Sequence, residues 1–141
     1  MKWNKIISSI IGACGGTLGY LFGGWDMALR ALLIFMFFDY TTGIICALKD
    51  KKLSSEVGFK GLLKKITILI VVAVAVQVDS IINANSLIRS LVLFFYISME
   101  GLSILENAAR MDVGIPDKLK DALIQLNEGN KKEIIREEVE K

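Results

Sequence analysis

The chain has 141 residues, of which 53% are hydrophobic, and its 17 basic and 15 acidic side chains leave a formal charge of +2. It contains no histidine, the commonest general base and metal ligand in proteins, and no catalytic or nucleotide-binding signature. Its apolar runs precede residue 110 and suit about four spanning helices of roughly 20 residues, which leaves no room for a soluble catalytic domain. We therefore expect an all-helical integral membrane protein that is not an enzyme and binds no metal or cofactor.

The first predicted span covers residues 6–24 and follows Lys2 and Lys5. Its glycines recur at i,i+4 spacing, which allows two membrane helices to approach until their backbones touch. We predict that this face contacts protein, either in the same chain or in a second copy. The face consists of Ser8, Gly12, Gly15, Gly16, Gly19 and Gly23. Cys14 loosely resembles the acceptor of a lipoprotein cleavage site, but the apolar run continues past it, which favours an uncleaved helix.

The second predicted span covers residues 27–48 and follows a turn at residues 24–26. Asp39 lies about 12 residues into it, roughly 18 Å along the helix axis and near the centre of a bilayer. A carboxyl at that depth costs about 2.5–3.5 kcal/mol on insertion scales, so Asp39 must be neutral, paired or in contact with water. Thr42, Gly43 and Cys46 continue its face, which predicts a protein-facing stripe. Cys14 and Cys46 are both interpreted as small buried apolar residues.

Residues 49–65 form a lysine-rich segment that predicts a loop or a short interfacial helix. Short basic loops remain cytoplasmic, so the lysines of this segment are expected to set the topology. They include Lys49, Lys51, Lys52, Lys64 and Lys65. By periodicity alone the third apolar run, residues 66–83, is compatible with a buried strand, but its length and the neighbouring spans favour a membrane helix. A turn is predicted at residues 83–85.

The fourth predicted span, residues 87–109, is apolar over most of its surface but carries one polar stripe at helical spacing. The stripe consists of Arg89, Tyr96, Glu100, Ser103, Asn107 and Arg110. Lipid offers no hydrogen bonds, so such a stripe must face protein or water. The alternative is that this helix lies in the membrane interface, which reduces the number of crossings to three.

With four crossings, every basic segment lies on the cytoplasmic side, and so do both termini. Residues 1–110 then form the transmembrane domain and residues 111–141 a charged cytoplasmic tail. Pro116 suits the first turn of a helix in this tail, and a break is expected at Gly129 and Asn130. The apolar stripe of the helix consists of Leu119, Ala122, Leu123 and Leu126. We expect it to rest on the membrane or the bundle, with a regulatory or partner-binding role as the alternative.

Two acids are predicted at similar depth on different helices. Glu100 lies about 13 residues, or roughly 20 Å, below the outer start of its helix, close to the depth of Asp39. No basic residue is expected at that level, because Arg30, Arg89 and Asp79 lie near the outer end and can balance one another there. Two carboxyls in a low dielectric oppose each other's ionisation, so we expect both to be neutral and hydrogen-bonded in a dry bundle. The hypothesis is that they line water in an open state; the alternative is that both are simply satisfied inside the bundle.

Several motifs coincide with those of one known family. They are Phe38–Gly43, the segment Lys49–Lys52 with Ser54, Ser55, Gly58 and Gly61, then Lys64, Lys65 and Asp79, and most specifically Glu100–Asn107 followed by Gly114–Pro116. Together they resemble the toxin-secretion/phage-lysis holin family over about residues 39–126. This family includes holins of phages of Gram-positive bacteria and holin-like proteins encoded beside clostridial toxin genes. The first helix matches in general character alone.

The resemblance implies a small protein that accumulates in the bacterial cytoplasmic membrane and oligomerises into lesions, through which an endolysin or a toxin leaves the cell. The expected partners are the lipid bilayer, further copies of the chain and this cargo, with no nucleic acid. Candidate pore-lining or gating residues are Asp39, Tyr96, Glu100, Ser103, Glu106 and Asn107. Two other functions stay open: a channel or transporter subunit that uses the acids as an ion site, and a non-conducting adaptor whose tail recruits a partner.

Overall fold

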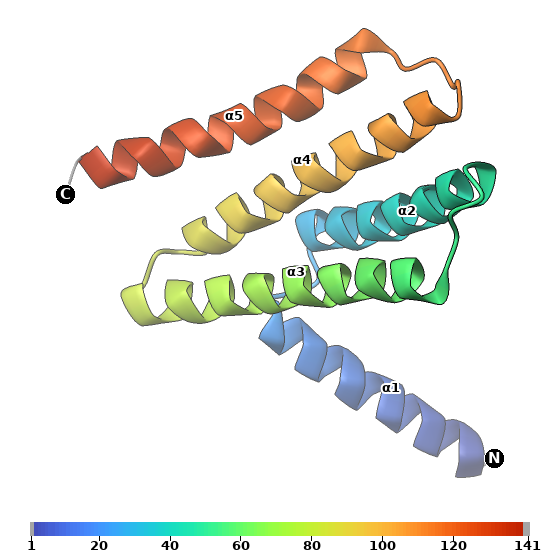
Figure 1. Cartoon of the computed structure of the whole chain (residues 1–141). Helices are drawn as coiled ribbons and strands as arrows, with labels where there is room; N and C mark the ends of the chain where they lie inside the picture. Colours follow the sequence, from blue (N-terminus) through green and yellow to red (C-terminus); the bar gives the residue numbers. More distant parts are fainter. Residues whose placement is uncertain (1, 140–141) are drawn as a thin grey trace.

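The computed structural model describes the backbone of residues 2–139 and the side chains as far as Glu128. Within that range the chain forms five α-helices and no strand. They are α1 (Lys2–Leu21), α2 (Met27–Lys49), α3 (Ser55–Ile82), α4 (Leu87–Arg110) and α5 (Asp117–Val139) (Figure 1). The expected all-helical fold class is confirmed, and the helical third run excludes the buried-strand alternative.

Short capped turns separate the central helices. Asp26 caps α2 by accepting a hydrogen bond from the Leu29 amide at 2.9 Å, and Ser54 caps α3 by accepting one from the Val57 amide at 3.2 Å. The cap at the other end of α3 is Asn83, whose φ of 54° lies in the left-handed region that asparagine tolerates. Because the connections are short, α2, α3 and α4 run antiparallel to their neighbours in the chain (Figure 1).

Helix α4 is the centre of the fold, since α2, α3 and α5 all pack against it while α2 and α3 touch each other far less. The apolar core lies among α2, α3 and α4. It consists of Phe22, Leu29, Leu32, Met36, Ile68, Val72, Leu93 and Ile97. Three helices therefore share one core, and the helices at the two chain ends lie outside it.

The outer surface of this three-helix unit is apolar. Large side chains point away from the core on each of its helices, and Phe37 on α2 and Ile70 on α3 are 65% and 57% exposed. Among the described helices, α2, α3 and α4 are each long and apolar enough to cross a membrane. An apolar outer surface on helices of that length suits lipid as the surrounding solvent.

The prediction of four crossings is not confirmed, because α1 is not among the helices with sufficient apolar length. Its run is shortened at both ends: Lys2, Asn4 and Lys5 lie within the helix, and residues 22–24 belong to the following turn. The alternative of three crossings placed the fourth span in the interface, yet α4 is one of the three candidates. The predicted span that lacks the apolar length to cross a membrane is therefore α1.

The lysine-rich segment is mostly helix and not loop. The turn after α2 occupies residues 50–54, and α3 begins at Ser55, so Lys60, Lys64 and Lys65 are helical residues. The expectation of a loop or a separate interfacial helix over residues 49–65 was therefore wrong beyond residue 54. The physical reason is local, since the Ser54 cap and Glu56 in the first turn are helix-start signals that outweigh the loss of apolar periodicity.

Helix α1 projects away from the bundle (Figure 1), and none of its residues is buried. A Cβ built on Gly12, Gly15 or Gly16 would meet nothing within 4 Å, while one on Gly19 would lie 3.1 Å from the Trp25 ring. Within its own chain the glycine ladder contacts Trp25 at Gly19 and at Gly15, whose carbonyl accepts a hydrogen bond from the indole at 2.9 Å. Contact with a second copy stays a prediction. Cys14 also lies on this helix and is exposed, so its interpretation as buried was wrong, whereas Cys46 is buried.

Helix α5 begins directly after Pro116 and lies antiparallel along α4 (Figure 1). It continues through Gly129 and Asn130; the expected break is absent because one helical glycine costs only about 0.5–1 kcal/mol relative to alanine. The apolar stripe contacts the bundle through Leu123, which lies against Gly101. The charged side chains of its described part are exposed. They are Asp117, Lys118, Lys120, Asp121 and Glu128.

Arg89 anchors the α1–α2 turn to α4. Its side chain is 5% exposed and donates from Nε to the Phe22 carbonyl at 2.6 Å, from Nη2 to the Gly24 carbonyl at 3.2 Å, and to both carboxylate oxygens of Asp26 at 2.6 and 3.2 Å. Gly23 adopts a φ of 74°, and a Cβ there would lie 2.9 Å from the Arg89 side chain. This close approach requires glycine at position 23.

The expected balance of Arg30, Arg89 and Asp79 at the outer end was wrong in its pairing. Arg89 pairs with Asp26, whereas Asp79 accepts hydrogen bonds from the Ile88 and Arg89 amides at 3.0 and 2.7 Å. Asp79 therefore satisfies amides at the N-terminus of α4, where the helix has unpaired donors. Arg30 donates to the backbone carbonyl of Asp26 at 3.4 Å.

The ion pair between Arg89 and Asp26 predicts that the α1–α2 turn changes its structure in acid. The hydrogen bonds from Arg89 lower the pKa of Asp26 below its ordinary value of 3.8. A carboxyl whose pKa is lower in the folded state stabilises the fold above pH 3.8, and that contribution is lost as the pH falls through the lowered pKa. In a Trp3→Phe background in detergent, the fluorescence of Trp25 should stay constant down to about pH 4 and change below it.

Asp26→Asn is the matched control, because asparagine retains the cap on α2 but not the ion pair. It should loosen the turn at neutral pH and abolish the acid transition. An unchanged transition in Asp26→Asn would assign it to other carboxyls.

Candidate functional site

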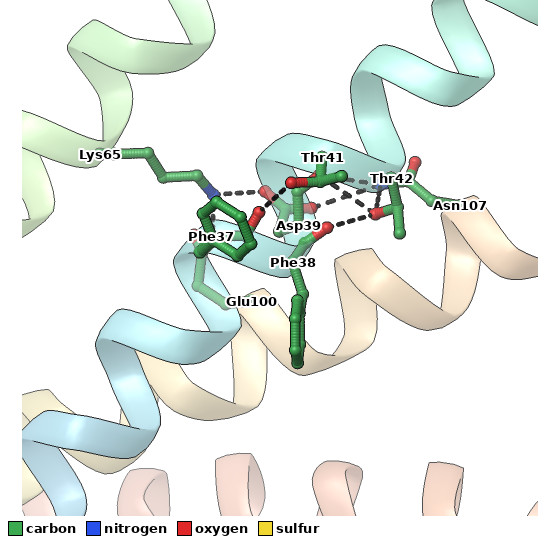
Figure 2. Close-up of polar contacts among 8 residues, drawn as sticks. All are labelled: Phe37, Phe38, Asp39, Thr41, Thr42, Lys65, Glu100 and Asn107. Carbon is green, nitrogen blue, oxygen red and sulfur yellow. Dashed lines mark hydrogen bonds and ion pairs between the residues drawn. The ribbon is translucent and has the colours of Figure 1, made fainter.

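One ammonium group lies between two carboxylates at the centre of the three-helix unit. Lys65 from α3 forms ion pairs with Asp39 of α2 and Glu100 of α4, and Figure 2 shows its Nζ directed at both carboxylates. The three side chains are 10%, 13% and 3% exposed in that order. We call these three residues the charged centre. It joins all three helices that have the apolar length to cross a membrane.

The helix ends explain why these residues meet. Each lies ten residues from the end of its helix nearest the 50–54 turn: Asp39 before Lys49, Lys65 after Ser55, and Glu100 before Arg110. Ten residues correspond to about 15 Å of helix. Since neighbouring helices are antiparallel, equal spacing from the same end of the bundle places the three groups at one level.

The expectation that no basic residue lies at the level of the acids was wrong. It followed from placing Lys65 in a loop, whereas the N-terminal extension of α3 carries it about 15 Å into the bundle. The argument for two neutral, mutually hydrogen-bonded acids depended on the missing cation, and with Lys65 between them that premise is removed. Lys65 was named in the sequence as a topology signal, so its contact with both acids was missed.

Asn107 lies seven residues, or about two turns, from Glu100 toward the Arg110 end of α4 and extends the polar contacts of the charged centre. Its amide donates to the Asp39 carboxylate at 3.4 Å and to the Thr42 hydroxyl at 3.0 Å (Figure 2). The Cys46 thiol donates to the Asn107 backbone carbonyl at 3.3 Å. Gly43 faces the same amide, since a Cβ there would lie 3.8 Å from it. The stripe predicted on α2 thus contacts protein, and its partner is the polar stripe of α4.

The candidate pore-lining residues divide into two groups. Asp39, Glu100 and Asn107 are brought together by the contacts above. Tyr96 and Ser103 are half-buried beside them, and Glu106 is exposed. Tyr96 packs against the apolar core.

Two cavities adjoin the charged centre. One of about 220 Å³ is lined by Asp39, Tyr40, Gly43, Lys64, Lys65, Ser103 and Asn107, among others. A second of about 250 Å³ is lined by Lys64, Tyr96, Glu100, Ser103 and Glu106, among others. Both walls combine polar side chains with a larger apolar part, and both cavities exceed the roughly 30 Å³ that one water occupies in the liquid. The charged centre is therefore buried by protein on some sides and accessible to small polar molecules on others.

The end of the bundle beside the 50–54 turn is held by surface ion pairs. Lys49 pairs with Asp112 at 3.1 Å and donates to the Arg110 carbonyl at 2.7 Å, while Arg110 pairs with Asp50. The sequence had indicated no role for Asp112. Exposed pairs of this kind contribute at most about 1 kcal/mol, so they position the ends of α2 and α4 without dominating the stability.

The charged centre suits helix packing better than ion binding or catalysis. A lysine ammonium occupies the space between the carboxylates where a bound cation would lie. No group of three or more potential metal ligands occurs among the residues that the structure describes. What the centre can do is to hold three helices together while their polar groups are paired.

These features define a class: a small helical membrane protein whose three apolar helices enclose one charged centre. The sequence pattern of the bacteriophage holin family matches residues 16–128. The chain belongs to this family, which is in general not enzymatic, and the resemblance seen in its motifs is confirmed.

Relatives of similar length support the assignment. An uncharacterized 14.9 kDa protein of Clostridium perfringens is 48% identical over 133 residues, which cover 94% of this chain and 95% of that protein. An uncharacterized protein of Listeria innocua is 43% identical over 110 residues, or 78% and 79% of the two chains. A probable holin of Bacillus phage phi105 is 37% identical over 111 residues, or 79% and 82%. No solved structure matches the chain.

Removal of the lysine is predicted to be far more damaging than removal of the whole charged centre. Lys65→Met leaves two buried carboxylates without a cation, and losing one partner of a buried pair typically costs about 3–5 kcal/mol. The triple change Lys65→Met, Asp39→Asn and Glu100→Gln should recover most of that loss. Thermal unfolding in detergent, followed by circular dichroism, measures both.

Lys64→Met is the matched control, because Lys64 is the exposed neighbour on the same helix. It should change the stability by less than about 0.5 kcal/mol. Equal loss in Lys64→Met and Lys65→Met would show that the charged centre does not stabilise the bundle.

Proposed function

We propose that the protein acts as a holin: several copies assemble in the bacterial cytoplasmic membrane and open a lesion that releases an endolysin or a toxin. The observation that carries the proposal is the inward orientation of the charged centre on three apolar helices. Membership of the holin family and the similarity to a probable phage holin support it.

One copy offers no passage for a protein. The core of α2, α3 and α4 is filled by apolar side chains, and the cavities beside the charged centre hold about 220 and 250 Å³. A folded domain of 100 residues has a radius of gyration of about 13 Å, far larger than either cavity. Release of such cargo therefore requires several copies that surround a common opening.

The charged centre fits a resting state that can be converted to an open one. While the helices are packed, Lys65 and the two carboxylates satisfy one another inside a single copy. If the helices separate in lipid, these groups lose their partners at high cost, whereas water in a lumen can solvate them. In the proposed open state Asp39, Glu100 and Asn107 line water, as do Lys65 and Ser103.

A selective channel or transporter is less well supported. Its ion site would use the two acids, yet Lys65 already neutralises charge between them. Such a protein would show saturable, selective flux, whereas a holin would give abrupt release of molecules irrespective of their charge. The two functions are therefore separable by experiment.

The first test is induced expression in a bacterium that carries a cytoplasmic cell-wall hydrolase without an export signal. Culture density and membrane potential are followed together. After a delay with normal growth, the potential should collapse and lysis should follow. Gradual growth inhibition with the hydrolase retained inside would contradict a large lesion and favour a channel or a non-conducting adaptor.

The same assay tests the charged centre. Asp39→Asn and Glu100→Gln weaken its ion pairs, so each should shift the onset of lysis, and we expect an earlier onset. Glu56→Gln is the control, since Glu56 is exposed in the first turn of α3 and is not a candidate pore-lining residue. Unchanged timing in both variants would remove the charged centre from gating.

Topology is testable with single cysteines in a background lacking Cys14 and Cys46. The proposed orientation predicts that Lys51→Cys and Glu128→Cys resist a membrane-impermeant maleimide in intact protoplasts, while Asn85→Cys reacts. The opposite pattern would invert the topology. Lys2→Cys decides the number of crossings: it is protected if α1 crosses the membrane and reactive if three helices cross.

A further inference from the structure

Helix α5 covers a face of α4 through a close contact at Gly101. A Cβ on Gly101 would lie 2.9 Å from both terminal carbons of Leu123 and 3.2 Å from Phe35. The leucine therefore fills a notch that exists because α4 has no side chain at that position. Figure 1 shows that α5 runs back along α4, antiparallel to it, after the turn that follows Arg110.

This contact lies at a depth where α4 would be in lipid. Gly101 is nine residues from the end of α4 at Arg110, or about 14 Å along the helix. Its partner Leu123 belongs to α5, and Lys118, Lys120 and Asp121 of the same helix are exposed. Hydrocarbon cannot solvate those charges, so α4 cannot be surrounded by lipid while α5 remains in place.

The apolar stripe of α5 is only partly used in this packing. Leu119 and Leu126 belong to the same apolar stripe as Leu123 but stay 48% and 37% exposed. Leu123 makes the close contact at Gly101, while these two leucines remain available to another apolar surface. The described part of α5 is suited to lie at a membrane surface instead, with its leucines toward the lipid and its charges toward water.

We propose that α5 is a removable cover: it leaves α4 when the bundle enters the bilayer, and the uncovered face around Gly101 then binds α4 of a second copy. This inference rests on the proposed function, because it names the surface through which the copies associate. Copies in one membrane share an orientation, so two α4 helices related by a two-fold axis can meet at Gly101, where the missing side chain permits close backbone approach.

The test uses a disulfide that holds α5 on α4. Gly101→Cys and Leu123→Cys are combined in a Cys14→Ser background, since Cys14 is exposed, and the purified full chain is oxidised in detergent. Removal of the leucine side chain makes room for the new Cβ. Formation of the intramolecular disulfide is expected, and its failure to form would overturn the inference, because the α4–α5 contact would then not be populated.

The oxidised and reduced chains are then added to vesicles that contain trapped fluorescent proteins. The oxidised chain should be extracted by carbonate and release at least tenfold less cargo, and reduction should restore insertion and release. Leu123→Cys alone should behave identically under both conditions. A verified locked chain that inserts and releases like its reduced form would overturn the inference.

Single cysteines test the second copy. In membranes, Gly101→Cys should form a disulfide-linked dimer, whereas Phe95→Cys should not, because it lies about 120° away around α4. Equal cross-linking at both positions would overturn the proposed contact. If the reduced double-cysteine chain inserts but releases nothing, the proposed holin function fails. The cross-linked dimer at position 101 still tests separately whether two copies associate through this face of α4.

Discussion

The structure depends on a single buried ammonium group. A lysine in the interior of an apolar bundle is costly unless it is paired, and Lys65 is paired with carboxylates on both neighbouring helices. Because the three groups are equally distant from one end of the bundle, this pairing sets the relative axial positions of α2, α3 and α4. Apolar packing alone would set them less strictly, since leucine and valine side chains tolerate shifts in register that an ion pair does not.

Around this centre the bundle is arranged for an apolar solvent. Its charged centre faces inward, and many of its large apolar side chains remain exposed on the outside. Under the proposed function, the packed bundle and an aqueous assembly are alternative ways to satisfy the same charges. For a member of the holin family, the charged centre thus supports the proposed change from a resting to an open state.

The terminal helices stand apart from this core in different ways. Helix α1 is attached at its C-terminal end, where Arg89 holds the turn and Trp25 donates a hydrogen bond to the Gly15 carbonyl at 2.9 Å. Helix α5 is attached along α4 through Leu123 at Gly101. The two terminal helices therefore differ in how much of their length contacts the core: α1 is attached at one end, and α5 packs along α4.

The sequence by itself determined the helical class, the three apolar segments that became α2, α3 and α4, the turns after Phe22 and Ile82, and the family. Apolar run length, turn residues and family motifs are local signals. It also indicated Asp39, Glu100 and Asn107 as inward-facing, because polar residues in an apolar helix must avoid lipid. Only the tertiary structure decided that Lys65 joins the two acids, that Arg89 pairs with Asp26, and that α5 lies on α4. Those contacts depend on where helices begin and how antiparallel neighbours align, and a start that moves from residue 66 to residue 55 turns a loop lysine into the centre of the bundle.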